Sequence, residues 1–319
     1  MGYSTVAMAS MTGFLQEWHN AEPFVVAHTS GSTGTPKSIR LLKSDMRASA
    51  TATNRFFGIH SGSVLAIPLS ADYIAGKMMA VRADVAGCRL LELPVSNDVD
   101  IKEHVDLLAV VPSQTKSLLL NPDAPQLVRN LLIGGAPLND DLARQVIDAG
   151  FSAYLGYGMT ETCSHVALRK IGNDDIFHAM PGISFSTDSR GSLIVESGNF
   201  SWKKLVTNDV VELVSAKSFR WLGRFDNVIN SGGIKLHPEE LEKEYRERIP
   251  SLPPFYLIGE TDDTLGQRLV MVAENPEDIL LDNIREIISD HHKTPKRIIS
   301  VTSLPQTANG KLRRILPAE

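Results

Sequence analysis

The chain has 319 residues, 43% of them hydrophobic, so it can bury a substantial core in roughly two domains. Its net charge of −5 comes from interspersed acidic and basic residues, which argues against nucleic-acid binding. Two cysteines without metal-ligand spacing, Cys88 and Cys163, indicate a reduced, cytoplasmic protein. No apolar run approaches the roughly 18–20 residues of a membrane span, and no signal-peptide pattern opens the chain.

The first half of the chain predicts alternating strands and helices. Residues 8–13 have the composition of an expression tag, so residues 1–13 are left out of the expected fold. Strands are expected at residues 24–27, 64–68, 89–93, 106–111, 129–133 and 151–155. Helices are expected at residues 44–57, 74–86, 113–120 and 140–149. The alternation predicts a mostly parallel sheet covered by helices, with ligands at the carboxyl ends of its strands.

The second half predicts a different organisation. Short strands at residues 193–196, 204–206, 210–214 and 218–222 indicate a small β subdomain. A compact α+β unit is expected after residue 225. Its helices are predicted at residues 238–248 and 278–291, and its strands at 255–259, 268–273 and 297–301.

The strongest functional signal is the stretch 28–37, HTSGSTGTPK, which follows an apolar run. A loop of this composition offers backbone N–H groups, hydroxyls and a positive charge to an anion, which indicates phosphate binding. Its spacing differs from the Walker pattern G-x-x-x-x-G-K-S/T, which excludes a P-loop NTPase. The stretch resembles the phosphate loop of the acyl-adenylate-forming superfamily. The resemblance implies that ATP is bound by Thr29, Ser30, Ser32, Thr33, Thr35 and Lys37.

The stretch 156–162, GYGMTET, matches the second signature of that superfamily. Tyr157 offers a flat face to a purine, where stacking is worth about 1–3 kcal/mol, and Gly158 lets the backbone approach the ligand. Thr160 can hydrogen-bond an α-phosphate. Glu161 is a hard oxygen ligand that suits Mg²⁺ together with substrate phosphates. The resemblance therefore implies catalytic roles for Thr160 and Glu161, with Glu161 as the metal ligand.

Two shorter segments add nucleotide contacts by resemblance. Gly135, Ala136 and Pro137, in a turn that is weak as a signal on its own, would border the adenine. Asp209 would hold the ribose hydroxyls. Asn208 stands before it where the family has glycine, a mild change because asparagine tolerates positive φ better than most residues.

The long stretch 223–242 and the stretch 305–312, PQTANGKL, complete the resemblance. Arg224 would reach the ribose and phosphate, and Asp226 would be the hinge between two domains. Gly232 and Gly233 would line the passage for pantetheine. Lys311 would carry the first half-reaction.

The resemblance implies an α/β fold with a large, N-terminally shortened α/β domain at residues 14–225. This domain would contain parallel sheets and a small β subdomain, and a small, mobile C-terminal α+β domain would follow at residues 226–319. Relatives carry well over a hundred residues before the phosphate loop, so a compact enzyme or a homodimer is expected.

The implied chemistry has two steps. A carboxylate attacks the α-phosphate of ATP and pyrophosphate leaves, and a thiol then attacks the acyl-adenylate and AMP departs. The implied cofactors and partners are ATP, Mg²⁺, coenzyme A as co-substrate and a small carboxylic acid, with no nucleic acid and no membrane span.

Among ligase families, the short N-terminus and the residues around 158–169 are most similar to o-succinylbenzoate–CoA ligase of menaquinone biosynthesis. Its substrate has an aromatic ring and two carboxylates, and the second carboxylate needs a cationic or hydrogen-bonding partner. Residues 68–76 resemble the acyl-pocket segment of the family, with Tyr73 where a histidine is usual. The candidate partners near that pocket are Lys77, Arg82, Ser164, His165 and Arg169, and the two arginines could instead lie on helix surfaces.

Three alternatives stay open. The enzyme could be another aryl- or acyl-CoA ligase, or an adenylation enzyme that loads a carrier protein instead of coenzyme A. It could also be an inactive nucleotide-binding scaffold, although the presence of Lys311, Glu161, Asp209 and Arg224 argues against that.

Overall fold

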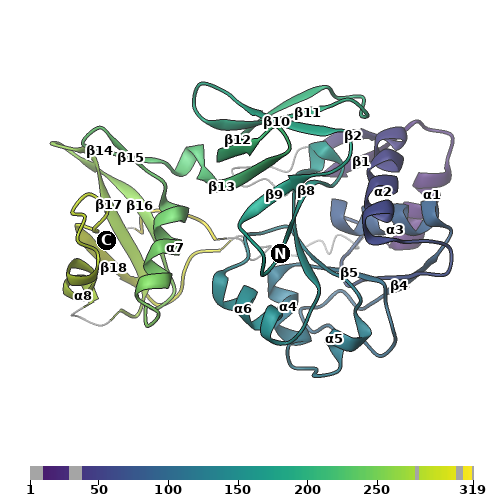
Figure 1. The fold of residues 1–319 in the computed structure, drawn as a ribbon, viewed down its shortest axis with the longest axis horizontal. Coiled ribbons are helices and arrows are strands. Elements are labelled where there is room, and N and C mark those ends of the chain that lie inside the picture. Colours follow the sequence, from purple (N-terminus) through teal and green to yellow (C-terminus); the bar gives the residue numbers. More distant parts are fainter. Residues whose placement is uncertain (1–9, 29–37, 277–279, 307–311, 318–319) are drawn as a thin grey trace, which may run out of the picture. The chain divides into compact units, whose positions relative to one another are not determined.

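The computed structural model describes residues 10–28, 38–276, 280–306 and 312–317 (Figure 1). Packing divides the chain into two compact units, each described here by itself. The first unit comprises Met1–Phe185, Val195–Leu205 and Ser215–Phe219, and the second comprises Ser186–Ile194, Val206–Val214 and Arg220–Glu319. The domain boundary at residue 226 stays a prediction.

Seven neighbouring strands of the large mixed sheet lie in the first unit in the order β9-β8-β7-β6-β5-β3-β4. They are β3 (Val64–Ile67), β4 (Arg89–Glu92), β5 (Leu107–Val110), β6 (Leu131–Ile133), β7 (Ala153–Gly158), β8 (His165–Lys170) and β9 (Ile176–Ala179). The five strands from β4 to β7 are parallel, as the alternating pattern predicts. Strands β8 and β9 are antiparallel to their neighbours, which makes the sheet mixed.

Five helices connect the strands of the first unit. They are α2 (Lys43–Phe57), α3 (Ile74–Ala86), α4 (Pro112–Leu118), α5 (Ala124–Leu127) and α6 (Asp140–Asp148). Helix α3 is well buried, since the eight consecutive residues from Gly76 to Ala83 are all buried. It ends at Gly87, whose left-handed φ of 63° closes the helix. This buried helix carries two of the predicted acyl-pocket residues.

The strand before the phosphate loop does not belong to the large sheet, which corrects the expectation. Strand β1 (Phe24–His28) pairs antiparallel with β2 (Ser38–Leu42) in a separate two-stranded sheet, with Val26 opposite Arg40. The buried Val25 and Ala27 give β1 the apolar face that its sequence predicts. An apolar run indicates a strand, but it does not specify the partner strand.

The exclusion of the first thirteen residues was wrong for residues 10–13. Helix α1 (Met11–His19) begins there, and the hydroxyl of its N-cap Ser10 accepts a 3.0 Å hydrogen bond from the N–H of Gly13. Met11, Phe14 and Trp18 are buried along one face of this helix. Their spacing of three and four residues is typical of an amphipathic helix. This spacing could have predicted α1, but residues 8–13 were set aside because they resemble an expression tag.

The segment after residue 164 also differs from expectation. Strands β8, β9 and β10 (Ile183–Thr187) occupy residues for which no element was predicted, so Arg169 lies on a strand and not on a helix. Strand β11 (Ser192–Ser197) and strand β13 (Ser218–Arg224) match expected strands, whereas β12 (Lys204–Ser215) is continuous where two strands were predicted. Asn208 lies inside β12 and does not adopt positive φ, so the conformational argument for that position was wrong.

The second unit contains a five-stranded, mostly antiparallel sheet. Its strands are β14 (Ile229–Ser231), β15 (Ile234–Leu236), β16 (Phe255–Asp262), β17 (Gly266–Glu274) and β18 (Arg297–Val301), with only β17 and β18 parallel. Helices α7 (Pro238–Arg248) and α8 (Leu280–Ile287) share a hydrophobic core with the sheet. A buried core that includes Tyr245, Phe255, Met271 and Ile284 joins helices to sheet.

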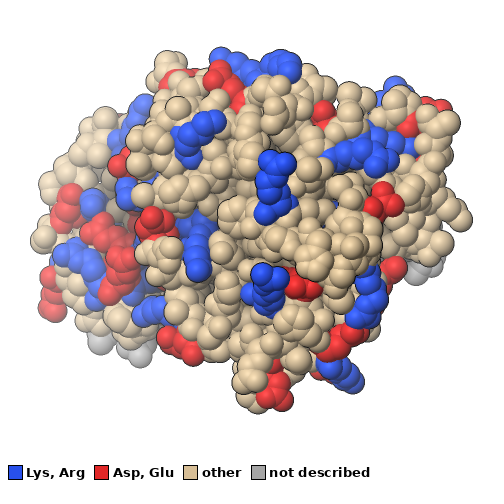
Figure 2. Space-filling model, turned by 45° about the vertical axis from the view of Figure 1, so that its right-hand side comes forward, with Lys and Arg blue, Asp and Glu red and all other residues tan. Residues whose placement is uncertain are grey.

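The charged residues are mixed on the surface, as they are in the sequence. Figure 2 shows Lys and Arg side chains scattered among Asp and Glu over the visible face, without a basic stripe. Among the described residues, no helix is long and apolar enough to cross a membrane.

Candidate active site

Seven of the predicted site residues lie outside the described residues. They are the six phosphate-loop residues Thr29, Ser30, Ser32, Thr33, Thr35 and Lys37, together with Lys311. Their roles stay predictions.

The adjacent carboxyl ends of β6 and β7 bring two predicted nucleotide segments together. Ile133 pairs with Leu155 in parallel register. The turn that contains Gly135, Ala136 and Pro137 therefore lies beside the segment that contains Tyr157 and Gly158. Gly135 has φ +82°, a conformation that favours glycine. This edge is where ligands gather in parallel α/β sheets.

Tyr157 is held by other aromatic rings. Its ring lies edge-on to Phe177 at 5.8 Å and to Phe219 at 5.1 Å between centroids. Phe177 and Phe219 stack on each other at 5.4 Å. Such packing fixes the orientation of the Tyr157 ring, and a ring of fixed orientation is the platform on which a base can stack at low entropic cost.

The second signature is a tight connection between β7 and β8. The strand register shifts between Tyr157 and Gly158, and a Cβ atom on Gly158 would lie 2.3 Å from the carbonyl oxygen of Ser164. Thr160 and Glu161 lie in a short 3₁₀ helix (Thr160–Thr162), half-buried. The Thr162 hydroxyl braces this turn, because it accepts from the N–H of Met159 at 3.0 Å and lies 2.7 Å from the Ser164 carbonyl.

Cys163, at the end of this turn, has φ +64°, which is uncommon for a residue with a side chain. Burial raises the pKa of its thiol to about 12, so the thiol is protonated and unreactive at neutral pH. Cys163 therefore contributes to the shape of the connection and not to nucleophilic chemistry.

Three of the candidate acyl-pocket residues converge in the first unit. Arg82 projects from α3 and donates from Nη2 to the hydroxyl of Ser164, and that hydroxyl lies 3.3 Å from Nδ1 of His165. Thr53 of α2 completes the group, with its hydroxyl 3.2 Å from Nε2 of His165. Thr53 was not predicted from the sequence, because nothing local marks a residue 112 positions before its partner.

Among the described residues, no carboxylate lies beside the buried cation of Arg82. Arg82 is 2% exposed, and in the part of the chain that the structure describes its Nε has no hydrogen-bond partner. Its Nη1 lies 3.4 Å from the sulfur of Met79. Burial lowers the pKa of Arg82 to about 10, which still leaves it charged at neutral pH. A buried charge without a counter-charge is costly to the fold. An anionic ligand would offset that cost.

His165 is neutral in this environment. Burial, and secondarily the charge of Arg82, lowers its pKa well below the ordinary value for histidine. A neutral imidazole beside the guanidinium can donate or accept one hydrogen bond without adding a second buried charge.

The other two candidate cations already have carboxylate partners. Lys77 is buried with its ammonium 3.9 Å from Glu17 and 4.6 Å from the centre of the Phe14 ring, and burial lowers its pKa. Arg169 donates to Asp175 at 2.6 Å. Of the three cations, Arg82 is the one best placed to receive an anion.

Tyr73, the remaining acyl-pocket candidate, immediately precedes α3 and is 44% exposed.

The second unit holds the predicted ribose-binding residues together. Asp209 Oδ1 lies 3.4 Å from Nη1 of Arg224 and 3.3 Å from the indole nitrogen of Trp221. Arg224 also reaches Asp226 at 3.5 Å, and Asp226 accepts from the amide of Asn208 at 3.3 Å. Trp221 was missed by the sequence prediction, since its partner Asp209 is twelve positions away on another strand.

Gly232 and Gly233 form the two-residue turn between β14 and β15. Their φ angles are +60° and +84°, and Ser231 pairs directly with Ile234. Both central residues of such a turn need positive φ, which explains the glycine pair by local geometry alone. Whether they also line a pantetheine passage stays a prediction.

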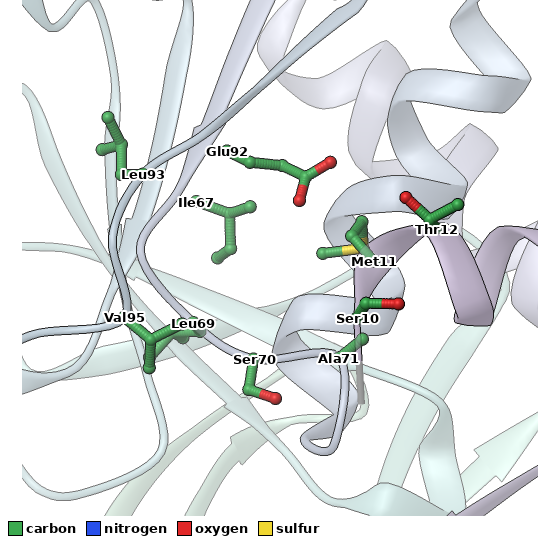
Figure 3. A pocket seen from close by; sticks show the side chains of 10 residues that line it. All are labelled: Ser10, Met11, Thr12, Ile67, Leu69, Ser70, Ala71, Glu92, Leu93 and Val95. Atoms are coloured by element: carbon green, nitrogen blue, oxygen red, sulfur yellow. The ribbon is translucent and has the colours of Figure 1, made fainter. Parts of the chain in front are cut away.

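A cavity of about 250 Å³ lies elsewhere in the first unit, between the start of α1 and the ends of β3 and β4 (Figure 3). Its lining includes Ser10, Met11, Ser70 and Glu92, and Ser70 belongs to the segment 68–76 that was expected to form the acyl pocket. Of the individually predicted site residues that the structure describes, none is among its lining residues.

Comparison with known proteins identifies the family. The AMP-binding enzyme family matches residues 9–185. A 2-succinylbenzoate–CoA ligase from Enterococcus faecalis is 27% identical over 91% of this chain and 68% of its own length. A probable 2-succinylbenzoate–CoA ligase from Mycobacterium tuberculosis is 29% identical over 91% of this chain and 82% of its own length.

Solved structures agree. An AMP-forming acyl-CoA synthetase/AMP-acid ligase II-like protein from Dyadobacter fermentans is 33% identical, with a TM-score of 0.63, over 94% of this chain and 90% of its own. The Bacillus subtilis o-succinylbenzoate coenzyme A synthetase, solved with ATP and magnesium, is 22% identical over 90% of this chain and 68% of its own, with a TM-score of 0.75, and shares the fold. The chain belongs to the AMP-binding enzyme family and is an enzyme of the AMP-forming acid–CoA ligase type.

Proposed function

We propose that this member of the AMP-binding enzyme family converts o-succinylbenzoate, ATP and coenzyme A into o-succinylbenzoyl-CoA, AMP and pyrophosphate. The observation that carries the choice of acid is the buried Arg82, which has Ser164 and His165 around it and no carboxylate partner among the residues that the structure describes. The named relatives are ligases for the same acid, which supports the choice.

The substrate has two carboxylates with different tasks. One becomes the acyl group, and the other needs a fixed counter-charge. Arg82 can give that carboxylate a charge-assisted, forked pair of hydrogen bonds, with the Ser164 hydroxyl as an additional donor. Neutral His165 would keep the site's charge at one, which matches one carboxylate.

The first half-reaction would need charge neutralisation and no general base. The acid's carboxylate oxygen forms a bond to the α-phosphorus, and the bond from that phosphorus to pyrophosphate breaks. Lys311, Thr160 and the residue 29–37 loop would stabilise the charge on the phosphates. Glu161 supplies a single carboxylate, which fits Mg²⁺ held jointly by one side chain and substrate phosphates, and the ion would neutralise further charge.

The second half-reaction would need a different orientation of the second unit from the first half-reaction. A turn about Asp226 would withdraw Lys311 and bring the Gly232–Gly233 turn to the acyl-adenylate. The sulfur of coenzyme A would then bond to the acyl carbon as the bond from that carbon to AMP breaks. Asp209 and Arg224 would hold the ribose.

The test is pyrophosphate release from ATP with a panel of acids: o-succinylbenzoate, benzoate, acetate and a long-chain fatty acid. Each acid is offered with free coenzyme A or with a phosphopantetheinylated carrier protein. We expect release and thioester formation only with o-succinylbenzoate and coenzyme A. Preference for another acid or for the carrier would overturn the assigned substrate or acceptor, and silence with every acid would favour the inactive scaffold.

A further inference from the structure

A buried cluster in the second unit lies close in sequence to two residues of the proposed mechanism. Arg314 follows Lys311 by three positions, and Asn227 directly follows the predicted hinge residue Asp226. The Arg314 guanidinium forms a two-pronged ion pair with Glu242 of α7, through Nη1 to Oε1 and through Nη2 to Oε2 at 2.9 Å. The Arg314 and Glu242 side chains are 12% and 6% exposed.

Glu239, one turn earlier on α7, links this pair to the hinge segment. Its Oε1 lies 3.4 Å from Nε of Arg314 and accepts from the amide of Asn227 at 2.5 Å. The backbone at Gly223 packs against the same carboxylate, since a Cβ atom there would lie 2.4 Å from its Oε2. One buried carboxylate thus contacts both the residue after the hinge and the chain near the C-terminus.

The chain on both sides of residues 307–311 is fixed by further bonds. The carbonyl of Ile315 accepts from the hydroxyl of Tyr256, and Arg314 Nη1 donates to the carbonyl of Leu257 at 2.9 Å. The N–H of Arg313 donates to the carbonyl of Pro305 at 2.9 Å, and Gln306 and Leu312 form an antiparallel bridge. The described residues on either side of 307–311 are therefore bonded to each other and attached to α7 and β16.

We propose that Arg314 is a positioning residue for adenylate formation. Its ion pair with Glu242 and Glu239, together with the Tyr256–Ile315 hydrogen bond, holds residues 312–315, which follow Lys311 directly in the chain. This inference rests on the proposed function, in which Lys311 acts in the first half-reaction. Positioning matters because a misplacement of about 1 Å can reduce a rate by about 10²-fold.

Two variants test the proposal, one that changes the guanidinium and one that removes a single hydroxyl. Arg314→Lys keeps the charge but loses the fork that matches Glu242. Tyr256→Phe removes only the hydroxyl that holds Ile315. The matched control is Arg248→Lys, because Arg248 pairs with Glu244 at 3.2 Å on the exposed face of α7.

We expect pyrophosphate release to fall about 10- to 100-fold in Arg314→Lys and less in Tyr256→Phe. Thioester formation from supplied acyl-adenylate should stay within about threefold in both, because Lys311 has no task in that step. The control should change neither rate. Equal loss of both half-reactions, or no loss in either variant, would overturn the proposal.

Hydrogen–deuterium exchange of the peptide that covers residues 303–316 provides a readout that does not depend on activity. Exchange should be faster in Arg314→Lys than in wild type or in Arg248→Lys. Unchanged exchange would refute the anchoring. If the wild type released no pyrophosphate with any acid, the proposed function and the role of Arg314 in it would fail, while the exchange result would still decide whether Arg314 anchors the segment.

Discussion

The three basic residues predicted near the acyl pocket have different partners in the structure. Lys77 faces Glu17, Arg169 faces Asp175, and Arg82 faces a hydroxyl. The sequence could nominate all three, because each lies near a recognisable motif. It could not rank them, because Glu17 is sixty positions from Lys77 and the ranking depends on tertiary contacts.

Replacement of Arg82 should separate its role from that of the paired cations. Arg82→Lys removes the forked donor, and loss of a charge-assisted hydrogen bond costs about 1.5–3 kcal/mol. We expect the KM for o-succinylbenzoate to rise about 10- to 100-fold while the KM for ATP is unchanged. Steady-state kinetics at several concentrations of each substrate measure both values.

The matched control for this prediction is Arg169→Lys, whose partner is Asp175. It should change the KM for o-succinylbenzoate by less than about threefold. An equal effect of the two substitutions would contradict the assignment of the second carboxylate to Arg82.

His165 should make stability depend on pH in a recognisable way. Its pKa in the folded protein lies below the value of the unfolded chain, about 6.5. The unfolded state therefore binds more protons, and stability falls as the pH drops below about 6.5. Between pH 7.5 and 5.5, protonation of this residue in the unfolded chain should lower the wild type's free energy of unfolding, by at most about 1.4 kcal/mol.

Urea unfolding of wild type and His165→Gln at both pH values measures this contribution. Other groups titrate alike in the two proteins, so the stability deficit of the variant should shrink at the lower pH, by at most about 1.4 kcal/mol. A deficit that stays constant would mean that the imidazole does not resist protonation.

The sequence predicted helices whose ends are marked by residues close by in the chain. Helices α3 and α7 match the predicted ranges 74–86 and 238–248, since Gly87 closes the first and Pro238 opens the second. The partner of β1 and the strands β8 and β9 were not predicted, because pairing depends on contacts distant in sequence. Helix α1 was missed for a different reason, the composition of its first residues.

The connection between β7 and β8 gives a prediction about glycine. Gly158→Ala would place a Cβ atom against the backbone of Ser164, so we expect a loss of about 1–3 kcal/mol in the free energy of unfolding. Gly134→Ala is the matched control, because nothing lies within 4 Å of its added Cβ atom. It should change stability by less than about 1 kcal/mol. Thermal or urea unfolding measures both, and equal effects would refute the close-packing argument.

Lys311 and the Gly232–Gly233 turn are expected to act in different half-reactions. Lys311→Ala should reduce adenylate formation at least about 100-fold, because a charge that stabilises the phosphates is lost. Thioester formation from supplied acyl-adenylate should stay within about threefold. Rapid-quench assays of each half-reaction measure the split, and equal loss of both would contradict the turn about Asp226.

The transfer of an oxygen atom from the acid to AMP shows whether the acid attacks the α-phosphorus of ATP. o-Succinylbenzoate labelled with ¹⁸O in its carboxylates is incubated with the wild-type enzyme, ATP, Mg²⁺ and coenzyme A, and the AMP is analysed by mass spectrometry. If the acid attacks the α-phosphorus, each AMP retains one labelled oxygen after the thiol takes the acyl group. Unlabelled AMP, or ADP as the nucleotide product, would contradict the account.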